Sequence, residues 1–263
     1  MTPYENEVFG SLLPLIEKYQ IPYFILGRGC NLIVSDQGFR GAAIYTAHLN
    51  NYEIHDTEIR AETGLKISTL ADKAAEHGLS GLEFGGGIPG TLGGALYMNA
   101  GAYGGEIKDI VKEAFVYNPQ GEKIHLSREE LQLDYRHSIF HKKDYLATEV
   151  FIELKKGNEK QIKEKIKELN RRRREKQPLS WPSAGSIFKR PPGHYAGKLI
   201  DDCGLKGMRV GDAQISEKHA GFMINLGQAT ARDIVKLIEK TQKEIYKQKG
   251  VKLEVEPRFI GEF

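Results

Sequence analysis

A glycine-dense stretch, LEFGGGIPGTLGGALYMNAGAYGGEI (82–107), is the part of the sequence whose residue types best suit ligand binding. Glycine has no Cβ and adopts positive φ at little cost, so such a stretch lets backbone N–H groups approach another molecule closely. Only Glu83 and Glu106 within it are able to form ion pairs. The composition suits the polar edge of a cofactor, although tight turns in a β-rich domain would use the same residues.

Two details of this stretch bear on that choice. The small polar turn 99–103 follows the apolar residues 95–98 directly, which favours a cofactor. Residues 85–90 match G-x-G-x-x-G, but that fingerprint must follow a strand and open a helix. A helix is expected upstream at 70–77, and Pro89 with Gly93-Gly94 argues against a helix that starts here. We therefore do not expect a Rossmann domain.

Two further segments carry residues suited to anions. Gly27 to Asn31 forms a turn between two short expected strands, where backbone amides are able to hold an anion. The run Arg171 to Arg174 lies on a strongly charged helix, and such a run is usually a solvated face. The other interpretation turns one arginine of this run inward to a phosphate, because a planar guanidinium matches phosphate oxygens.

Composition and length indicate an ordinary globular protein. The protein has 263 residues, enough for about two domains, with 28% charged and 40% hydrophobic residues. Its net charge of +3 is too small to indicate nucleic-acid binding by itself. Cys30 and Cys203 are its only cysteines, which suits a reducing compartment better than a disulfide framework. No signal peptide or membrane-spanning stretch is recognisable, so we expect a cytoplasmic protein without a membrane partner.

Hydrophobic periodicity and turn residues predict the elements that position these segments. The first helix is expected to use Thr2 as its N-cap and to carry Val8 to Ile16. Further helices are expected at 67–77, 158–176 and 195–203, and from Thr230 to 249. Strands are expected at 23–26, 32–34, 42–45, 52–55, 58–63, 113–117, 123–126, 146–154, 213–216, 222–225 and 253–260.

Five ordered blocks carry a resemblance to a known family. They are LGRGCNLIVSD (26–36), GLEFGGGIPGTLGGALYMNAGAYGGEI (81–107), YRHSIF (135–140), PSAGSIFK (182–189) with YAGKLIDDCGLKG (195–207), and LEVEPRFIG (253–261). Together they resemble the UDP-N-acetylenolpyruvoylglucosamine reductase family, MurB. The resemblance covers essentially the whole sequence.

The resemblance implies an α+β fold with an FAD-binding domain of the vanillyl-alcohol-oxidase type in two subdomains, plus a C-terminal α+β substrate-binding domain. The implied limits are 1–157 for the flavin domain, divided near residue 45, 158–178 for a connecting helix and 179–250 for the substrate domain. The strand in 251–263 would return to the flavin domain. The implied activity, in peptidoglycan precursor synthesis, is NADPH-dependent reduction of the enolpyruvyl ether of a UDP-sugar through non-covalent FAD.

The family's catalytic residues fall on Ser186, Arg136 and Glu256. Hydride addition to the enol ether leaves carbanion or enolate charge beside a carboxylate. Arg136, permanently cationic, would stabilise that charge. A serine hydroxyl is a weak acid, but toward such an intermediate Ser186 is acidic enough to donate the proton. Each residue taken alone has an ordinary structural explanation, and only its place in the blocks favours catalysis.

The implied ligand contacts follow from the same blocks. FAD would contact Gly27, Arg28, Gly29, Cys30, Asn31, Leu32, Ile88, Pro89, Gly90, Thr91, Gly93, Gly94, Asn99, Gly101, Ala102, Tyr103 and Arg174. The UDP-sugar would contact Tyr195, Lys176 and Arg258. No metal and no nucleic-acid partner is implied, and a monomer is expected.

The sequence departs from the family in three places. Members usually have a strand and a Thr-Thr-Phe-Arg-Ile-Gly-Gly-like segment before the first helix, whereas this sequence begins at that helix. Lower FAD affinity or lower stability is therefore one of the expectations. Cys30 replaces a common serine, and Arg190 replaces a common asparagine near the substrate. The alternatives are a flavin oxidase or dehydrogenase for another small molecule, a catalytically impaired binding protein and, more distantly, a nucleic-acid binder.

Overall fold

A computed structural model describes residues 1–263. The protein forms two compact units. Unit 1 comprises residues 1–28 and 41–171, and unit 2 comprises residues 29–40 and 172–263. The predicted limits of the flavin-binding and substrate-binding domains stay a prediction. None of the helices is both long and apolar enough to cross a lipid bilayer.

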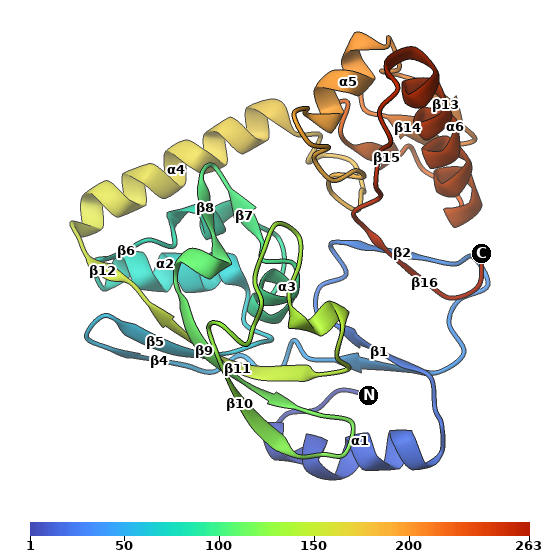
Figure 1. Ribbon diagram of the computed structural model, residues 1–263. Helices are drawn as coiled ribbons and strands as arrows, with labels where there is room; N and C mark the ends of the chain where they lie inside the picture. Colours follow the sequence, from blue (N-terminus) through green and yellow to red (C-terminus); the bar gives the residue numbers. More distant parts are fainter. The chain divides into compact units, whose positions relative to one another are not determined.

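The main sheet of unit 1 is antiparallel (Figure 1). Its five strands, in the order β10-β9-β11-β5-β4, are β4 (Tyr52–His55), β5 (Glu58–Glu62), β9 (Val111–Tyr117), β10 (Lys123–Ser127) and β11 (Leu146–Glu153). The expected hairpin of β4 and β5 is confirmed. Thr148 is an extra residue in β11 that interrupts its pairing with β9, so it forms a β-bulge.

Three small strand pairs complete unit 1. They are β1 (Tyr23–Leu26) with β3 (Ala42–Tyr45), β6 (Leu79–Ser80) with β12 (Lys155–Lys156), and β7 (Gly101–Ala102) with β8 (Gly105–Glu106). The first pair is parallel and the other two are antiparallel.

Apolar residues at helical spacing pack the helices into a core that they share with the main sheet. The helices are α2 (Ile67–Glu76), α3 (Leu92–Tyr97) and α4 (Glu159–Lys176), with short 3-10 helices η2 (Glu83–Gly87), η3 (Ile107–Asp109) and η4 (Ile139–His141). Leu70 and Ala74 of α2 and Ile166 of α4 share one buried core with Ile59 and Val150 of the sheet. The apolar stripe that the sequence places on the charged helix α4 is therefore buried.

The first helix begins later than expected. The 3-10 helix η1 (Asn6–Val8) leads into α1 (Phe9–Lys18), and neither start is capped by a side-chain hydrogen bond. The predicted N-cap at Thr2 is wrong, because Met1 lies along β3 instead: Tyr45 N–H donates to Met1 O at 2.9 Å. Phe9 packs in a separate core cluster that includes Tyr117.

Unit 2 contains a small sheet and two helices. Strands β13 (Arg209–Val210), β14 (Ala213–Ile215) and β15 (Met223–Asn225) are antiparallel, β2 (Leu32–Val34) pairs in parallel with β16 (Arg258–Ile260), and the helices are α5 (Ala196–Asp202) and α6 (Ala231–Lys249). Thr230 caps α6 as predicted, since its hydroxyl accepts a hydrogen bond from Asp233 N–H at 3.1 Å.

Two further predictions about elements need correction. A helix does start within the glycine-dense stretch: Thr91 caps α3 and accepts a hydrogen bond from Gly94 N–H at 3.2 Å. The cap and the apolar residues Leu92, Ala95 and Leu96, all buried, outweigh the low helix propensity of two glycines. The last strand is also shorter than the expected 253–260, because only Arg258–Ile260 pairs regularly.

Candidate active site

Several glycines of the dense stretch are required by the packing of unit 1. A Cβ at Gly86 would lie 2.7 Å from Ile166 Cγ2, and a Cβ at Gly105 would lie 2.6 Å from a ring carbon of Phe84. Gly93 approaches Thr63 equally closely, and its N–H donates to Thr63 O at 2.8 Å. These glycines therefore allow close internal contacts, as the alternative interpretation of tight packing and turns requires.

Gly90 differs from these residues. No atom lies within 4 Å of the position that its Cβ would occupy, and its φ is not in the left-handed region. Gly94 is exposed and meets only the hydroxyl of Thr91, at 3.5 Å. Neither packing nor backbone conformation requires glycine at residue 90. An open backbone at this place fits the close approach of a ligand.

Thr91 connects Gly90 with the turn Gly27 to Asn31, called here the first glycine turn. A Cβ at Gly27 would lie 2.5 Å from Thr91 Oγ1, so only glycine fits at residue 27. Thr91 is buried, and its hydroxyl caps α3. The bridge between Lys66 and Thr91 uses hydrogen bonds of neighbouring residues, from Ile67 N–H to Gly90 O and from Leu92 N–H to Leu65 O. The N–H of Thr91 therefore takes no part in the bridge.

Asn99 is a fully buried residue whose side chain is used within the protein. Its Nδ2 donates to Glu106 Oε2 at 2.7 Å and to Asp134 O at 3.1 Å. Its Oδ1 accepts from Lys108 N–H at 2.8 Å, and its φ of 41° is left-handed. The amide therefore fixes the end of the dense stretch to the loop that carries Arg136. Asn99 was predicted only as a cofactor contact, so this structural role is additional to the prediction.

Arg136 lies at the tip of a tight turn. Asp134 and His137 exchange backbone hydrogen bonds of 3.1 and 3.0 Å across it, and Arg136 adopts a φ of 52°. A left-handed arginine is uncommon and costs conformational energy, so its surroundings must hold it. Ser138, fully buried, donates from its hydroxyl to Tyr97 O at 2.6 Å and so fixes the turn to the end of α3.

The segment that carries Ser186 lies between two other segments of unit 2. On one side Ser186 forms an antiparallel bridge with Phe222, and Ile187 N–H donates to Gly221 O at 2.9 Å. On the other side Glu256 N–H donates to Ile187 O at 2.8 Å. Ser186 is half-buried at the end of this paired segment. Unit 2 therefore brings the segments that carry the predicted residues Ser186 and Glu256 side by side.

The second half of the first glycine turn also belongs to this group. Asn31 O accepts a hydrogen bond from Arg258 N–H at 3.0 Å, and Asn31 Nδ2 contacts Glu256 O at 3.5 Å. The Cβ position of Gly185 lies 3.8 Å from Cys30 O. Part of the glycine turn predicted to contact FAD, the predicted proton donor and the predicted glutamate are therefore neighbours within unit 2.

The residues predicted to bind substrate are exposed. Tyr195 is the N-cap residue of α5, and the guanidinium of Arg190 lies over its ring at 4.6 Å. Lys176 ends α4, and Arg258 begins β16. A cation above an exposed aromatic ring stabilises the ring's position by about 0.5–1 kcal/mol. Arg190, the residue that departs from the family pattern, is thereby placed beside one predicted substrate contact.

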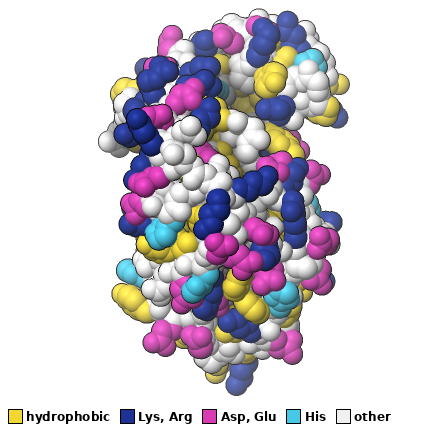
Figure 2. Space-filling view, turned by 90° about the vertical axis from the view of Figure 1, so that its left-hand side faces the viewer, with side chains coloured by type: hydrophobic (Ala, Val, Ile, Leu, Met, Phe, Trp, Pro, Cys, Tyr) yellow, Lys and Arg dark blue, Asp and Glu magenta, His cyan; other side chains and the backbone are white.

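The arginine run at the end of α4 is mostly exposed. Arg174 is exposed, and its backbone carbonyl oxygen accepts from Lys218 Nζ at 2.6 Å. Within the run only Arg173 is half-buried. The face drawn in Figure 2 carries basic and acidic side chains intermixed, without a continuous basic field. A contact of Arg174 with a phosphate stays a prediction.

The predicted residues fall in both units. Unit 1 contains Gly27, Arg28, Ile88, Pro89, Gly90, Thr91, Gly93, Gly94, Asn99, Gly101, Ala102, Tyr103 and Arg136, and unit 2 contains Gly29, Cys30, Asn31, Leu32, Arg174, Lys176, Ser186, Tyr195, Glu256 and Arg258. Within unit 2, hydrogen bonds and close contacts join Asn31, Glu256 and Arg258 to the segment that carries Ser186, and they do not join Arg174, Lys176 or Tyr195 to it. No cluster of potential metal ligands is present among them or elsewhere in the protein.

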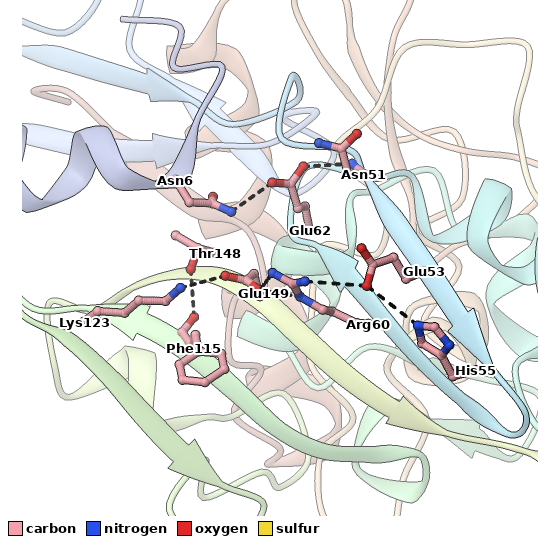
Figure 3. Close-up of polar contacts among 10 residues, drawn as sticks. All are labelled: Asn6, Asn51, Glu53, His55, Arg60, Glu62, Phe115, Lys123, Thr148 and Glu149. Atoms are coloured by element: carbon pink, nitrogen blue, oxygen red, sulfur yellow. Dashed lines mark hydrogen bonds and ion pairs between the residues drawn. The ribbon is translucent and has the colours of Figure 1, made fainter.

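One buried carboxylate lies outside the predicted set. Glu149 accepts hydrogen bonds from Arg60 Nε at 2.7 Å and from Lys123 Nζ at 2.9 Å on the main sheet (Figure 3). Burial opposes its ionisation, but the hydrogen bonds from Lys123 and Arg60 outweigh burial and hold the pKa of Glu149 below its usual value. Thr148, the bulged residue beside it, accepts at its C=O from Thr63 N–H at 2.9 Å. This network supports Thr63, the residue against which Gly93 packs.

Comparisons with known proteins agree with this geometry. The FAD binding domain family matches residues 3–127, and the UDP-N-acetylenolpyruvoylglucosamine reductase C-terminal domain family matches residues 177–260. The UDP-N-acetylenolpyruvoylglucosamine reductase of Caldanaerobacter subterraneus subsp. tengcongensis is 49% identical over 260 residues, which cover 99% of this protein and 86% of the relative. That of Caldicellulosiruptor saccharolyticus is 50% identical over 255 residues, which cover 96% and 82%.

A solved structure gives the same result. The crystal structure of UDP-N-acetylenolpyruvylglucosamine reductase (MurB) from Thermus caldophilus matches with a TM-score of 0.82 and 37% identity, over 94% of this protein and 88% of the solved one. Fold and matched domains define an FAD-binding oxidoreductase of mixed helix and strand content with a distinct C-terminal domain family. The predicted fold class is confirmed. Within that class, the protein belongs to the UDP-N-acetylenolpyruvoylglucosamine reductase family, as its five sequence blocks indicated.

Proposed function

We propose that this protein reduces UDP-N-acetylenolpyruvoylglucosamine to UDP-N-acetylmuramate in peptidoglycan precursor synthesis, with FAD as cofactor and NADPH as reductant. The observation that carries the proposal is the grouping of Ser186, Glu256 and Asn31 within unit 2, joined by the hydrogen bonds of Glu256 to Ile187 O and Arg258 to Asn31 O. Membership of the reductase family is the basis for proposing this substrate.

The backbone offers a cradle that fits FAD. Gly90 has open space at its Cβ position, the N–H of Thr91 is unused by its bridge, and Gly27 packs directly against Thr91. We assign the predicted flavin contacts, from Gly27 to Leu32, from Ile88 to Gly94 and from Asn99 to Tyr103, to this cofactor. When bound, FAD would carry the hydride from NADPH to the terminal carbon of the enol ether.

Arg136 would hold the charge that develops on the substrate. Hydride addition at the terminal carbon leaves enolate charge next to the carboxylate, and a fixed cation stabilises that charge most when the cation needs no reorganisation. The left-handed backbone at Arg136 and the hydrogen bonds of Asp134 and Ser138 support such fixation.

Ser186 would donate the proton to the adjacent carbon. Its hydroxyl is a much weaker acid than water-exposed carboxyl groups, but a carbanion-like centre is basic enough to accept its proton when the distance is short. Pairing of residues 186–187 with residues 221–222 and with Glu256 supports a fixed position for the hydroxyl. We assign Glu256, on the neighbouring segment, to the same protonation step.

The remaining assignments belong to the same proposal. Tyr195, Lys176 and Arg258 would contact the UDP part, and Arg174 a phosphate of FAD. NADPH would use the site of the sugar nucleotide in alternation with it, so no separate dinucleotide fingerprint is needed. We propose a monomeric, cytoplasmic enzyme.

The test separates the two half-reactions. The purified protein should show a flavin absorbance spectrum, which NADPH bleaches and the enolpyruvyl sugar restores. Ser186→Ala should leave bleaching by NADPH within about twofold of the wild type and slow the restoration by roughly a hundredfold or more. Ser180→Ala, at an exposed serine of the same loop, should change neither rate.

Three outcomes would contradict the proposal. Equal loss of both rates in Ser186→Ala would exclude the assigned role of Ser186 as proton donor. A colourless protein that takes up no added FAD would exclude FAD as the cofactor. A flavoprotein that is bleached by NADPH but not restored by the enolpyruvyl sugar would point to another small-molecule substrate.

A further inference from the structure

His219, in the turn between β14 and β15, contacts the backbone that pairs with Ser186. Its Nδ1 accepts a hydrogen bond from Gly221 N–H at 3.1 Å. Its backbone carbonyl accepts another from Phe222 N–H at 3.0 Å. Because Nδ1 is the acceptor, the imidazole is neutral and carries its proton on Nε2.

Close packing fixes the imidazole in this place. A Cβ at Gly221 would lie 3.0 Å from His219 Cε1, so a larger residue there would push the ring away from the backbone by a few tenths of an ångström. From α5, the Cβ position of Gly197 lies 3.5 Å from the same atom. The ring also meets Phe222 edge to face, with centroids 4.9 Å apart. His219 thus fills the space between α5 and residues 221–222.

Residues 221–222 form one side of the pairing that holds Ser186. Gly221 O accepts from Ile187 N–H at 2.9 Å, and Phe222 bridges to Ser186 itself. A shift of Gly221 therefore moves the backbone on which the Ser186 hydroxyl is carried. In enzymes, displacements of about 1 Å at a reacting group cost up to a hundredfold in rate.

We infer that His219 is a positioning residue for Ser186, which it holds in place through Gly221 and Phe222 by acting as a neutral hydrogen-bond acceptor. The inference rests on the proposed function, in which Ser186 donates the proton. It adds a residue that touches neither substrate nor cofactor but fixes the geometry of the proton donor.

The charges around His219 favour its neutral form. Burial lowers the pKa of His219 below its usual value, and Lys206, after α5, and Lys176, at the end of α4, act in the same direction. Glu217 and Lys218 directly precede His219 in its own turn. As the pH falls through this lowered pKa, Nδ1 gains a proton and no longer accepts from Gly221 N–H. The hold on Ser186 is therefore complete above a pH of about 6.5 and is lost in acid.

Two substitutions separate hydrogen bonding from space filling. His219→Ala removes the acceptor. His219→Asn keeps one, because the amide oxygen of its side chain accepts the N–H two residues further on, as in an Asx-turn, and does not titrate. The readouts are flavin bleaching by NADPH, its restoration by the enolpyruvyl sugar as a function of pH, and hydrogen exchange of the Gly221 and Ile187 amides.

The inference predicts a distinct pattern. His219→Ala should slow restoration roughly ten- to a hundredfold, leave bleaching by NADPH within about twofold, and speed exchange of both amides. His219→Asn should restore the rate and the amide protection, and should lack the decline of the restoration rate in acid that the wild type shows. If His219→Ala does not fold, the pH profile of His219→Asn decides the question.

Other patterns would overturn the inference. Unchanged amide exchange in His219→Ala, an equal loss of both half-reactions, or a failure of His219→Asn to restore the rate would each exclude positioning by hydrogen bonding. If the wild type does not reduce the enolpyruvyl sugar, the proposed function fails. Amide exchange still shows in that case whether His219 holds the Ser186 segment.

Discussion

Asn99 donates a hydrogen bond from its buried amide to the backbone carbonyl of Asp134 at 3.1 Å. This bond connects the end of the glycine-dense stretch to the turn that carries Arg136. The same amide group bonds Glu106 and Lys108, so every polar atom of the Asn99 side chain has a partner within the protein. A residue predicted to bind flavin thus also fixes the proposed electrostatic catalyst.

Replacing Asn99 by leucine should therefore destabilise unit 1. Asn99→Leu keeps the approximate size but leaves the partly buried groups Lys108 N–H and Glu106 Oε2 without this partner. We expect the free energy of unfolding in urea to fall by about 1–3 kcal/mol, since an unsatisfied buried polar group costs about that much. Asn50→Leu, at an exposed asparagine with one weak hydrogen bond to Ala47 O, should change it by less than about 0.5 kcal/mol. Equal effects of the two substitutions would show that the Asn99 network does not support the fold.

The sequence predicted most elements because their signals are local. The hairpin of β4 and β5, the helix capped by Thr230 and the buried stripe of α4 all follow from periodicity and caps. The start of the first helix was predicted wrongly because Met1 pairs with β3, a contact between residues distant in sequence. Helix α3 was missed because its cap and buried apolar side chains outweigh its glycines.

The candidate site was predicted by resemblance more than by residue pattern. Glycine density alone does not separate turns from a ligand site in the dense stretch, and only the polar turn at 99–103 favours a cofactor. The structure divides the glycines of this stretch between two environments. Gly86 and Gly105 serve packing, whereas Gly90 has open space. The supporting roles of Asn99 and His219 depend on partners brought together by the fold. No local signal identifies them, although a histidine two residues before a glycine is a weak hint.

Gly90 and Gly86 provide a matched pair for the flavin site. In Gly90→Ala the new Cβ meets no protein atom, so the apoprotein should keep its stability within about 0.5 kcal/mol or gain slightly from reduced conformational entropy of the unfolded state. Its affinity for FAD should nevertheless fall, by roughly tenfold, about 1.4 kcal/mol, if the backbone approaches the cofactor there. Fluorescence titration of the apoprotein with FAD measures this change.

Gly86→Ala should show the opposite pattern. Its Cβ would lie 2.7 Å from Ile166 Cγ2, so the free energy of unfolding should fall by about 1–3 kcal/mol through overpacking. FAD affinity of the folded fraction should change little. Unchanged FAD affinity in Gly90→Ala would exclude Gly90 from the flavin contacts.

Glu149 should make stability depend on pH. Its folded-state pKa is lowered, because hydrogen bonds from Lys123 and Arg60 outweigh burial, so the unfolded state binds more protons in this range. The contribution of the Glu149 carboxylate to stability is therefore fully present above its unfolded-state pKa of about 4.3. It is lost as the pH falls through the lower folded-state pKa. At pH 7, Glu149→Gln should reduce the free energy of unfolding by about 2 kcal/mol.

Urea unfolding between neutral and acid pH measures this dependence. The difference between the wild type and Glu149→Gln should shrink as the pH falls below about 4, because Glu149 then becomes neutral as well. Glu53→Gln, at an exposed carboxylate that contacts Arg60 at 3.6 Å, should cost less than about 1 kcal/mol. A constant difference across the pH range would contradict the assigned ionisation of Glu149.

Asp36 ties the segment after the first glycine turn to α6, although it lies far from that helix in sequence. Its Oδ1 accepts from Ala231 N–H at 2.7 Å and its Oδ2 from Arg232 N–H at 3.1 Å, so one carboxylate satisfies two N–H groups at the helix N-terminus. Asp36→Ala should lower the free energy of unfolding by about 1–2 kcal/mol. Asp36→Asn, which keeps one oxygen acceptor but no charge, should lower the free energy of unfolding by about half as much.

Because β2 connects Asn31 to Asp36, the same substitutions should weaken FAD binding in proportion if the turn at Asn31 contacts the cofactor. Destabilisation without any change in FAD affinity would show that the position of the turn does not depend on this cap.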